Sequence, residues 1–203
     1  LKLFDAILAQ LSKLDLVKND PKTDCLLENI KRELKQKPLK GEPKRKIVIF
    51  SEYLDTVKYL TSILEKNFDK KVLVVGHDLS THKIAQINKD FDASYPDQEN
   101  DYDILLASDK ISEGFNLNRA GLVINYDIPW NPNRLEQRMG RIHRYKQKED
   151  VHIFNLVADN TREGMVLARV LDKLEMIRKA IGSDKVYDVI GEIFPAKDLY
   201  RLV

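Results

Sequence analysis

One short stretch of this 203-residue chain contains arginines spaced for phosphate chemistry. Arg138, Arg141 and Arg144 lie three residues apart, and Gly140 separates the first two. Arginine stays charged at physiological pH, and its planar fork of N–H donors matches phosphate oxygens. On a helix, such a row can meet a nucleoside triphosphate, a nucleic-acid backbone or only water. Charge alone favours a solvated face, whereas the order Gln-x-x-Gly-Arg-x-x-Arg, which starts at Gln137, favours a function.

The composition bounds the possible functions. Hydrophobic residues make up 43% of the chain and charged residues 33%, as in globular proteins that bury a sizeable core. The net charge is only +2, so a nucleic-acid surface would need local segregation of charge. The single cysteine, Cys25, excludes an internal disulfide and a multi-cysteine zinc site. No apolar run is long enough for a membrane span, and we predict a cytoplasmic protein with no metal site of its own. Because the chain opens on Leu1 inside an amphipathic pattern, we expect a piece of a longer protein.

Short β-branched runs alternate with helical patterns through the middle of the chain. The predicted strands are 47–50, 72–75, 104–107, 122–125 and 151–156. The first runs lack polar alternation, as expected for strands covered on both faces. Helical spacing of apolar residues follows in 54–64 and 84–91. This alternation predicts an α/β fold with a mainly parallel sheet in a three-layer arrangement.

Helical patterns also occur at both ends of the chain. Residues 1–18 and the stretch after Asp20-Pro21 have apolar residues at helical spacing, and Asp20 is a good N-cap for the second helix. Residues 162–181 are again helical in pattern. We therefore predict an N-terminal helical extension and linker over 1–45, an α/β lobe over 46–160 and C-terminal helices over 161–203.

Polar sequences follow three of the predicted strands. Ser51 follows the first strand, Ser108 begins the segment after 104–107, and Asn125 leads into 126–132 and the arginine row. Carboxyl ends of parallel strands meet at one edge, where ligands gather in open sheets. The sequence thus predicts a single polar, partly basic surface, in which Asp127 is a structural strand-end acid.

Three segments in a fixed order identify a family resemblance. They are LLASDKISEGFNL (105–117), DIPWNP (127–132) and LEQRMGRIHR (135–144). Together they resemble the C-terminal RecA-like lobe of superfamily-two helicases of the SWI/SNF-like type, and especially the bacterial RNA polymerase-associated ATPase branch. The similarity extends over roughly 46–160 and implies a RecA-like fold for that lobe.

The resemblance implies a nucleotide-contacting set. In this family the two arginines of Gln-x-x-Gly-Arg-x-x-Arg reach across a cleft to ATP held on the other lobe. It therefore implies that Arg141 and Arg144 are catalytic arginine fingers. By the same resemblance, the residues expected to contact ATP are Gln137, Glu113, Gly114 and Asn116, with Gly114 allowing close backbone approach.

A second implied set contacts nucleic acid. Ser51 and Ser108 match positions that touch the nucleic-acid backbone, Trp130 aligns with an aromatic residue that contacts DNA, and Lys110 and Arg138 could add phosphate contacts. Four of these five residues have a structural alternative. Ser51 could be a helix N-cap, Trp130 could be packing between two prolines, and the two cations could be solvated charges.

No phosphate-binding loop occurs in the chain, since none of its eight glycines precedes a lysine. ATP and Mg²⁺ are thus expected mainly on an N-terminal lobe of the same parent chain, and the isolated fragment is predicted to be inactive. The expected partners are that lobe, nucleic acid (double-stranded DNA first) and possible proteins such as RNA polymerase. Two alternatives stay open: an RNA helicase lobe, and a non-catalytic module that binds nucleic acid or protein.

Overall fold

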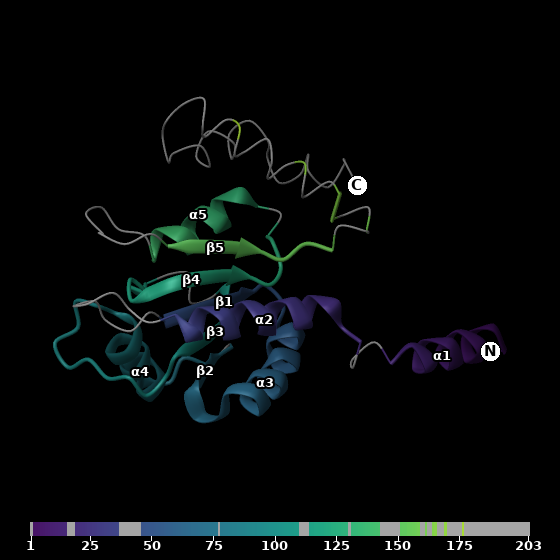
Figure 1. Ribbon diagram of the computed structural model, residues 1–203, viewed down its shortest axis with the longest axis horizontal. Coiled ribbons are helices and arrows are strands. Elements are labelled where there is room, and N and C mark those ends of the chain that lie inside the picture. The colour runs from purple at the N-terminus through teal and green to yellow at the C-terminus, as the bar shows by residue number, and fades with distance from the viewer. Residues whose placement is uncertain are drawn as a thin grey trace.

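The fold is a five-stranded sheet with helices on both faces (Figure 1). The structure, a computed structural model, describes residues 2–15, 19–36, 46–76, 78–109, 114–129, 131–142, 151–158, 161, 164–165, 169 and 176. The helices are α1 (Lys2–Leu14), α2 (Pro21–Lys35), α3 (Leu54–Phe68), α4 (Thr81–Phe91) and α5 (Pro132–Gly140), and a 3-10 turn, η1, spans Asp69–Lys71. The strands are β1 (Lys46–Ser51), β2 (Val72–Val75), β3 (Ile104–Ser108), β4 (Ala120–Asn125) and β5 (His152–Asn155).

The sheet is parallel throughout, with strand order β2-β3-β1-β4-β5. β1 lies in the centre, and the chain moves to one side for β2 and β3 before it crosses to β4 and β5. All five predicted strands are present, and the two predicted internal helices form α3 and α4. The prediction of a mainly parallel α/β fold is confirmed. The predicted helix over 162–181 lies almost entirely outside the described residues.

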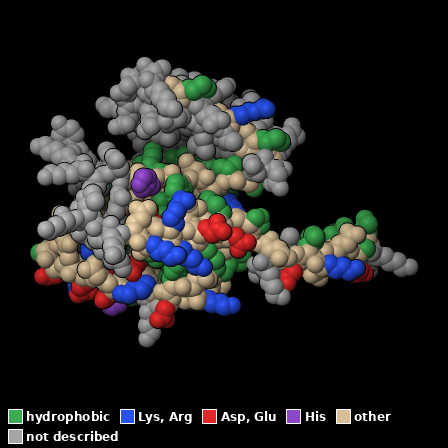
Figure 2. All heavy atoms as spheres, in the orientation of Figure 1, with side chains coloured by type: hydrophobic (Ala, Val, Ile, Leu, Met, Phe, Trp, Pro, Cys, Tyr) green, Lys and Arg blue, Asp and Glu red, His purple; other side chains and the backbone are tan. Residues whose placement is uncertain are grey.

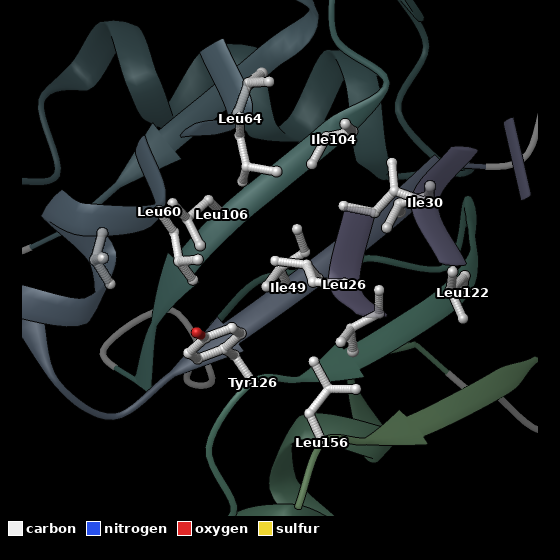
Figure 3. Close-up of a cluster of buried hydrophobic side chains, with 14 residues drawn as sticks. Leu26, Ile30, Ile49, Leu60, Leu64, Ile104, Leu106, Leu122, Tyr126 and Leu156 are labelled. Carbon is white, nitrogen blue, oxygen red and sulfur yellow. The ribbon is translucent and has the colours of Figure 1, made fainter. Parts of the chain in front are cut away.

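Alternate residues of each strand face opposite sides of the sheet, and each side has its own core. On one side α2 and α3 cover the strands, and Leu26, Leu60 and Ile49 are among the side chains completely removed from water (Figure 3). On the other side α4 contributes Ile87 and Phe91, which pack with inward residues of the same strands. Burying one such side chain stabilises the fold by about 1.5–3 kcal/mol. Two-sided burial explains why the strand sequences are uninterrupted apolar runs.

The second helix begins where the sequence predicts. Asp20 caps α2 by accepting hydrogen bonds from the backbone N–H groups of Lys22 (3.0 Å) and Thr23 (3.3 Å). Leu26 and Ile30 then bury completely against the sheet. Although predicted as part of an N-terminal extension, α2 shares one hydrophobic core with α3 and the strands.

The first helix makes a contrast with α2. Figures 1 and 2 show α1 projecting away from the sheet, with hydrophobic side chains along one side. These side chains are strongly exposed: Leu3 74%, Phe4 71%, Ile7 44%, Leu8 58%, Leu11 45% and Leu14 55%. Within the predicted range 1–18, a helix therefore forms over Lys2–Leu14, and its apolar face is not covered in the described part of the chain.

Candidate functional site

Four strands end at the same edge of the sheet in polar residues. β1 ends in Ser51, β3 in Ser108, β4 in Asn125 and β5 in Asn155. Ser51 is in register with Ser108, and Asn125 with Asn155. We call this the carboxyl edge. It is the edge at which open parallel sheets bind ligands.

Asp127 joins the end of β1 to the end of β4. Its Oδ2 accepts a hydrogen bond from Ser51 Oγ at 2.5 Å, and its Oδ1 accepts from the backbone N–H of Glu52 at 2.6 Å. The prediction of a structural strand-end acid is thereby confirmed for Asp127. The N-cap alternative for Ser51 is wrong, because Tyr53 is the N-cap residue of α3 and makes no side-chain cap bond. Ser51 is completely buried, and its hydroxyl hydrogen is directed to Asp127.

Arg138 is a buried cation rather than a solvated one. Its side chain is completely removed from water, with Nε 2.7 Å and Nη2 2.5 Å from Asp109 Oδ1. Its Nη1 donates to Asn125 Oδ1 at 2.8 Å and to the carbonyl of Asp127 at 3.1 Å, and its guanidinium lies 5.2 Å from the ring centre of Phe50. The expectation of a solvated charge is wrong. A phosphate contact by Arg138 would require it to leave these partners.

Arg134 extends the same set of contacts to the surface. Its Nη1 lies 2.8 Å from Glu52 Oε1 and 3.4 Å from Asp109 Oδ2. The Arg134 side chain is 46% exposed, so this end of the set meets solvent. We call the connected residues the carboxyl-edge network: Ser51, Glu52, Asp109, Asn125, Asp127, Arg134, Arg138 and Asn155, the last of which accepts from Asn125 Nδ2 at 2.8 Å. The network ties four strand ends and α5 into one unit.

Ser108 is held inside the domain. It is only 4% exposed, and its Oγ donates to the carbonyl of Gly76, just beyond β2, at 3.0 Å. The hydroxyl thus links the ends of β2 and β3, next to the carboxyl-edge network.

Arg141 and Gln137 lie on or directly after α5. Gln137 is exposed and Arg141 is half-buried. The carbonyl of Arg141 accepts a hydrogen bond from the backbone N–H of Leu117 at 2.8 Å, which fixes the end of α5 to the segment before β4. Gln137 thus lies on the helix that Arg138 anchors, and Arg141 lies where the chain leaves that helix beside the segment before β4.

Two other predicted nucleotide residues fall in the segment 114–119. Gly114 has a φ of +98°, a conformation that favours glycine. No described atom lies within 4 Å of a Cβ added there, so its conformation rather than close packing within the domain explains the glycine. Asn116 Nδ2 donates to Asp92 Oδ2 at 3.1 Å, beside the C-terminus of α4. That contact places Asn116 near the amino end of β4, apart from the carboxyl-edge network.

The remaining predicted site residues are Lys110, Glu113, Trp130 and Arg144, and all four lie outside the described residues. Asp109, Gly114 and Pro129, which are the chain neighbours of Lys110, Glu113 and Trp130, are described. The sequence therefore places Lys110 directly after the Asp109 end of the carboxyl-edge network.

Three hydroxyl groups surround the carboxylate of Asp20. One of them belongs to Tyr126, which lies between the network residues Asn125 and Asp127 in sequence. Asp20 Oδ2 accepts from Thr23 Oγ1 (2.6 Å), Tyr59 OH (3.0 Å) and Tyr126 OH (3.2 Å). Burial raises the pKa of Asp20, but these bonds outweigh it and hold the pKa below its ordinary value. Burial also raises the pKa of the Tyr126 hydroxyl well above its ordinary value. We call these four residues the Asp20 cluster.

Sequence reasoning missed Asp109, Arg134 and the inward position of Arg138. A signal for the last was present, because Leu135, Arg138 and Ile142 lie on one helical face, and Leu135 and Ile142 are buried. Chemically, the edge offers guanidinium groups and strand-end amides suited to phosphate. Within the described ranges no group of three His, Cys, Asp or Glu residues could hold a metal ion. No helix of the described residues is long and apolar enough to cross a membrane.

Comparisons with known proteins found one matching family and several relatives similar to this chain. The family described as "Helicase conserved C-terminal domain" matches residues 22–146. An uncharacterized ATP-dependent helicase, YqhH of Bacillus subtilis, is 36% identical over 73% of this chain and 25% of its own length. The RNA polymerase-associated protein RapA of Haemophilus influenzae is 32% identical over 57% of this chain and 15% of its own length. This chain thus spans 25% of the length of the Bacillus relative and 15% of the length of the Haemophilus relative.

The fold has close structural counterparts. The SWI2/SNF2 ATPase core of Sulfolobus solfataricus, solved in complex with double-stranded DNA, superposes with a TM-score of 0.56 at 22% identity, over 92% of this chain and 36% of that chain. At this identity the match establishes the fold alone. The predicted RecA-like fold is confirmed, and so is the resemblance to SWI/SNF-like helicases.

Proposed function

Because this chain belongs to the family of the helicase conserved C-terminal domain, we propose that it is one motor lobe of an ATP-dependent, SWI/SNF-like translocase on nucleic acid. ATP and Mg²⁺ are held mainly by an N-terminal lobe of the parent chain. The lobe formed by the present chain completes the nucleotide pocket. The chain itself has no Gly-x-x-x-x-Gly-Lys-Ser/Thr sequence with which to cradle phosphates.

The observation that carries this proposal is the anchoring of α5 at the carboxyl edge. Arg138 holds α5 against the ends of β3 and β4 through Asp109 and Asn125. The helix in which the Gln-x-x-Gly-Arg-x-x-Arg sequence begins is thus anchored at the edge where parallel sheets bind ligands. Arg141 follows this helix directly and Arg144 comes three residues later in the sequence, and both are proposed to supply positive charge to the nucleotide.

In the proposed mechanism Arg141 and Arg144 act as arginine fingers. They stabilise charge on the phosphoryl oxygens during transfer to water, an effect of about 10³–10⁵ in rate. Gln137, Glu113 and Gly114 help join the nucleotide to this lobe. Asn116 is a weaker candidate, because its amide donates to Asp92.

We also propose that this lobe contacts nucleic acid through residues that follow the strand ends in sequence. We propose Ser108, Lys110 and Trp130 as backbone contacts, with double-stranded DNA as the substrate. Ser51 and Ser108 would donate to a phosphate only after their hydroxyls released Asp127 and the carbonyl of Gly76, respectively. Arg138 leaves this set, because its guanidinium is buried in the lobe. Binding of this kind falls steeply with salt and shows little sequence preference. RNA polymerase as a partner and a bacterial cytoplasmic location stay predictions.

The test is ATP hydrolysis by the full-length protein with and without nucleic acid. Arg141→Ala is expected to lower the DNA-stimulated kcat by about 10³–10⁵. The matched control is Arg32→Ala, an exposed arginine on α2 outside the carboxyl-edge network, which should keep the wild-type rate. A wild-type rate for Arg141→Ala would overturn the arginine-finger role. Stimulation by RNA alone would overturn the choice of duplex DNA, and Mg²⁺-dependent turnover by the isolated chain would overturn the half-pocket arrangement.

A further inference from the structure

Asp109 connects the proposed nucleic-acid contacts at the end of β3 with α5, the helix that precedes the proposed arginine fingers. In sequence it separates Ser108 from Lys110, two proposed contacts to the nucleic-acid backbone. In space its Oδ1 contacts Nε and Nη2 of Arg138, and its Oδ2 lies 3.4 Å from Nη1 of Arg134. One carboxylate thus joins the nucleic-acid end of β3 directly to the helix that leads into Arg141.

We propose that the Asp109–Arg138 ion pair is the link by which nucleic acid bound at the end of β3 positions the arginine-finger helix α5. The inference rests on the proposed function. It adds the residues that couple the binding of nucleic acid to the hydrolysis of ATP. Asp109 and Arg138 are positioning residues here, because neither is assigned a contact with ATP.

Burial makes this pair a stiff connection. Arg138 is completely removed from water and Asp109 is 17% exposed at its side chain. Separating such a pair leaves a buried charge without its partner, which costs several kcal/mol in proteins. A shift of Asp109 on nucleic-acid binding therefore moves α5 with it, rather than breaking the contact.

The other contact between β3 and α5 is weaker. Arg134 is 46% exposed and lies nearer to Glu52 than to Asp109. Solvent and salt screen such a pair. The hydrogen bonds from Arg138 to Asn125 and Asp127 give α5 a second hold on β4, so the position of α5 depends on how the ends of β3 and β4 lie.

The experiment measures stimulation of ATP hydrolysis by double-stranded DNA in the full-length protein. Asp109→Asn keeps the side-chain shape and one accepting oxygen but removes the charge. We expect stimulation of kcat to fall about 5- to 150-fold, the usual range for coupled sites. DNA affinity, measured by fluorescence anisotropy, should change about twofold or less, well below the about tenfold that 1.4 kcal/mol would give.

A double variant and a matched control separate coupling from folding. Asp109→Asn with Arg138→Gln leaves no unpaired buried charge, so it should regain stability against urea without regaining stimulation. Asp90→Asn removes a completely buried carboxylate at the opposite edge of the sheet and should lower stability but keep stimulation. If the single or the double variant keeps wild-type stimulation, the coupling role is wrong. If the wild-type protein shows no DNA stimulation, or Arg141→Ala keeps it, the proposed function fails instead.

Discussion

Two buried cations lie at opposite edges of the same sheet. At the carboxyl edge Arg138 pairs with Asp109, and at the amino edge Lys46 Nζ lies 3.3 Å from Asp90 Oδ1 and 4.0 Å from Asp103 Oδ1. Both cationic side chains are completely removed from water. Burial lowers the pKa of Lys46, although Asp90 opposes the shift. Buried charge alone therefore does not distinguish a functional site from a structural one.

The carboxyl-edge network and the amino-edge cluster, which consists of Lys46, Asp90 and Asp103, differ in whether their contacts reach solvent. At the amino edge Lys46 also donates to the carbonyl of Tyr102, and the buried Arg119 donates to the carbonyls of Lys89 and Glu99, closing the loop after α4 over the cluster. The carboxyl-edge network instead continues outward to the half-exposed Arg134. The proposed coupling role belongs to the ion pair whose contacts reach the carboxyl edge, whereas the enclosed pair is expected only to stabilise the fold.

The largest expected effect on stability is at the amino edge. Lys46→Met leaves Asp90 without its cation and should lower the free energy of unfolding by about 3–5 kcal/mol. Urea denaturation at neutral pH measures the loss. DNA-stimulated ATP hydrolysis per folded molecule of the full-length protein should not change.

The control for Lys46→Met is a double variant that removes both the cation and one of its carboxylate partners. Lys46→Met with Asp90→Asn should regain part of the stability. A loss in the single variant below about 1 kcal/mol, as is usual for surface ion pairs, would show that the amino-edge cluster is solvated and would end the comparison.

A smaller effect is expected in the Asp20 cluster, which has one acid and no cation among its four members. Tyr126→Phe removes a hydroxyl 3.2 Å from Asp20 Oδ2 and should cost about 0.5–1.5 kcal/mol at pH 7. Because burial raises the pKa of Tyr126, the unfolded chain loses the phenolic proton at a lower pH than the folded one. This group therefore favours folding below its ordinary pKa of about 10 and loses that contribution as the pH rises further.

The measurement is the difference in unfolding free energy between wild type and Tyr126→Phe at pH 7 and near pH 11. The difference should shrink at high pH. Lys46 acts in the opposite direction in this range, since its lowered pKa makes stability rise with pH, and the comparison of two proteins that both contain Lys46 removes its contribution. A difference that grows at high pH would contradict the assigned environment of Tyr126.

The sheet could be predicted because its signal is local. Ile47, Val48 and Ile49 are consecutive apolar residues with no polar alternation, and such runs form strands covered on both faces. The Asp20 N-cap is local in the same sense, because its bonds reach only Lys22 and Thr23.

The charged contacts could not be predicted in the same way. The Arg138 side chain meets Asp109, 29 residues earlier, and nothing in the row of arginines states which member turns inward. The buried position of Lys46 likewise depends on Asp90 and Asp103, which only the fold brings together. Arginine spacing thus singled out the candidate stretch but did not indicate which of its arginines is buried.

The smallest expected effect lies at the exposed end of the carboxyl-edge network. Arg134→Gln breaks contacts with Glu52 and Asp109 that are open to solvent, so it should cost about 0–1 kcal/mol, and the cost should vanish in high salt. Lys58→Gln is the matched control, because its pair with Asp55 on α3 is more exposed still and should cost nothing measurable. Urea denaturation in low and high NaCl measures both. If Arg134→Gln cost as much as Lys46→Met, the outer part of the network would be as enclosed as the amino-edge cluster. Solvent exposure would then no longer distinguish the carboxyl edge from the amino edge, and only the binding of ATP and nucleic acid could do so.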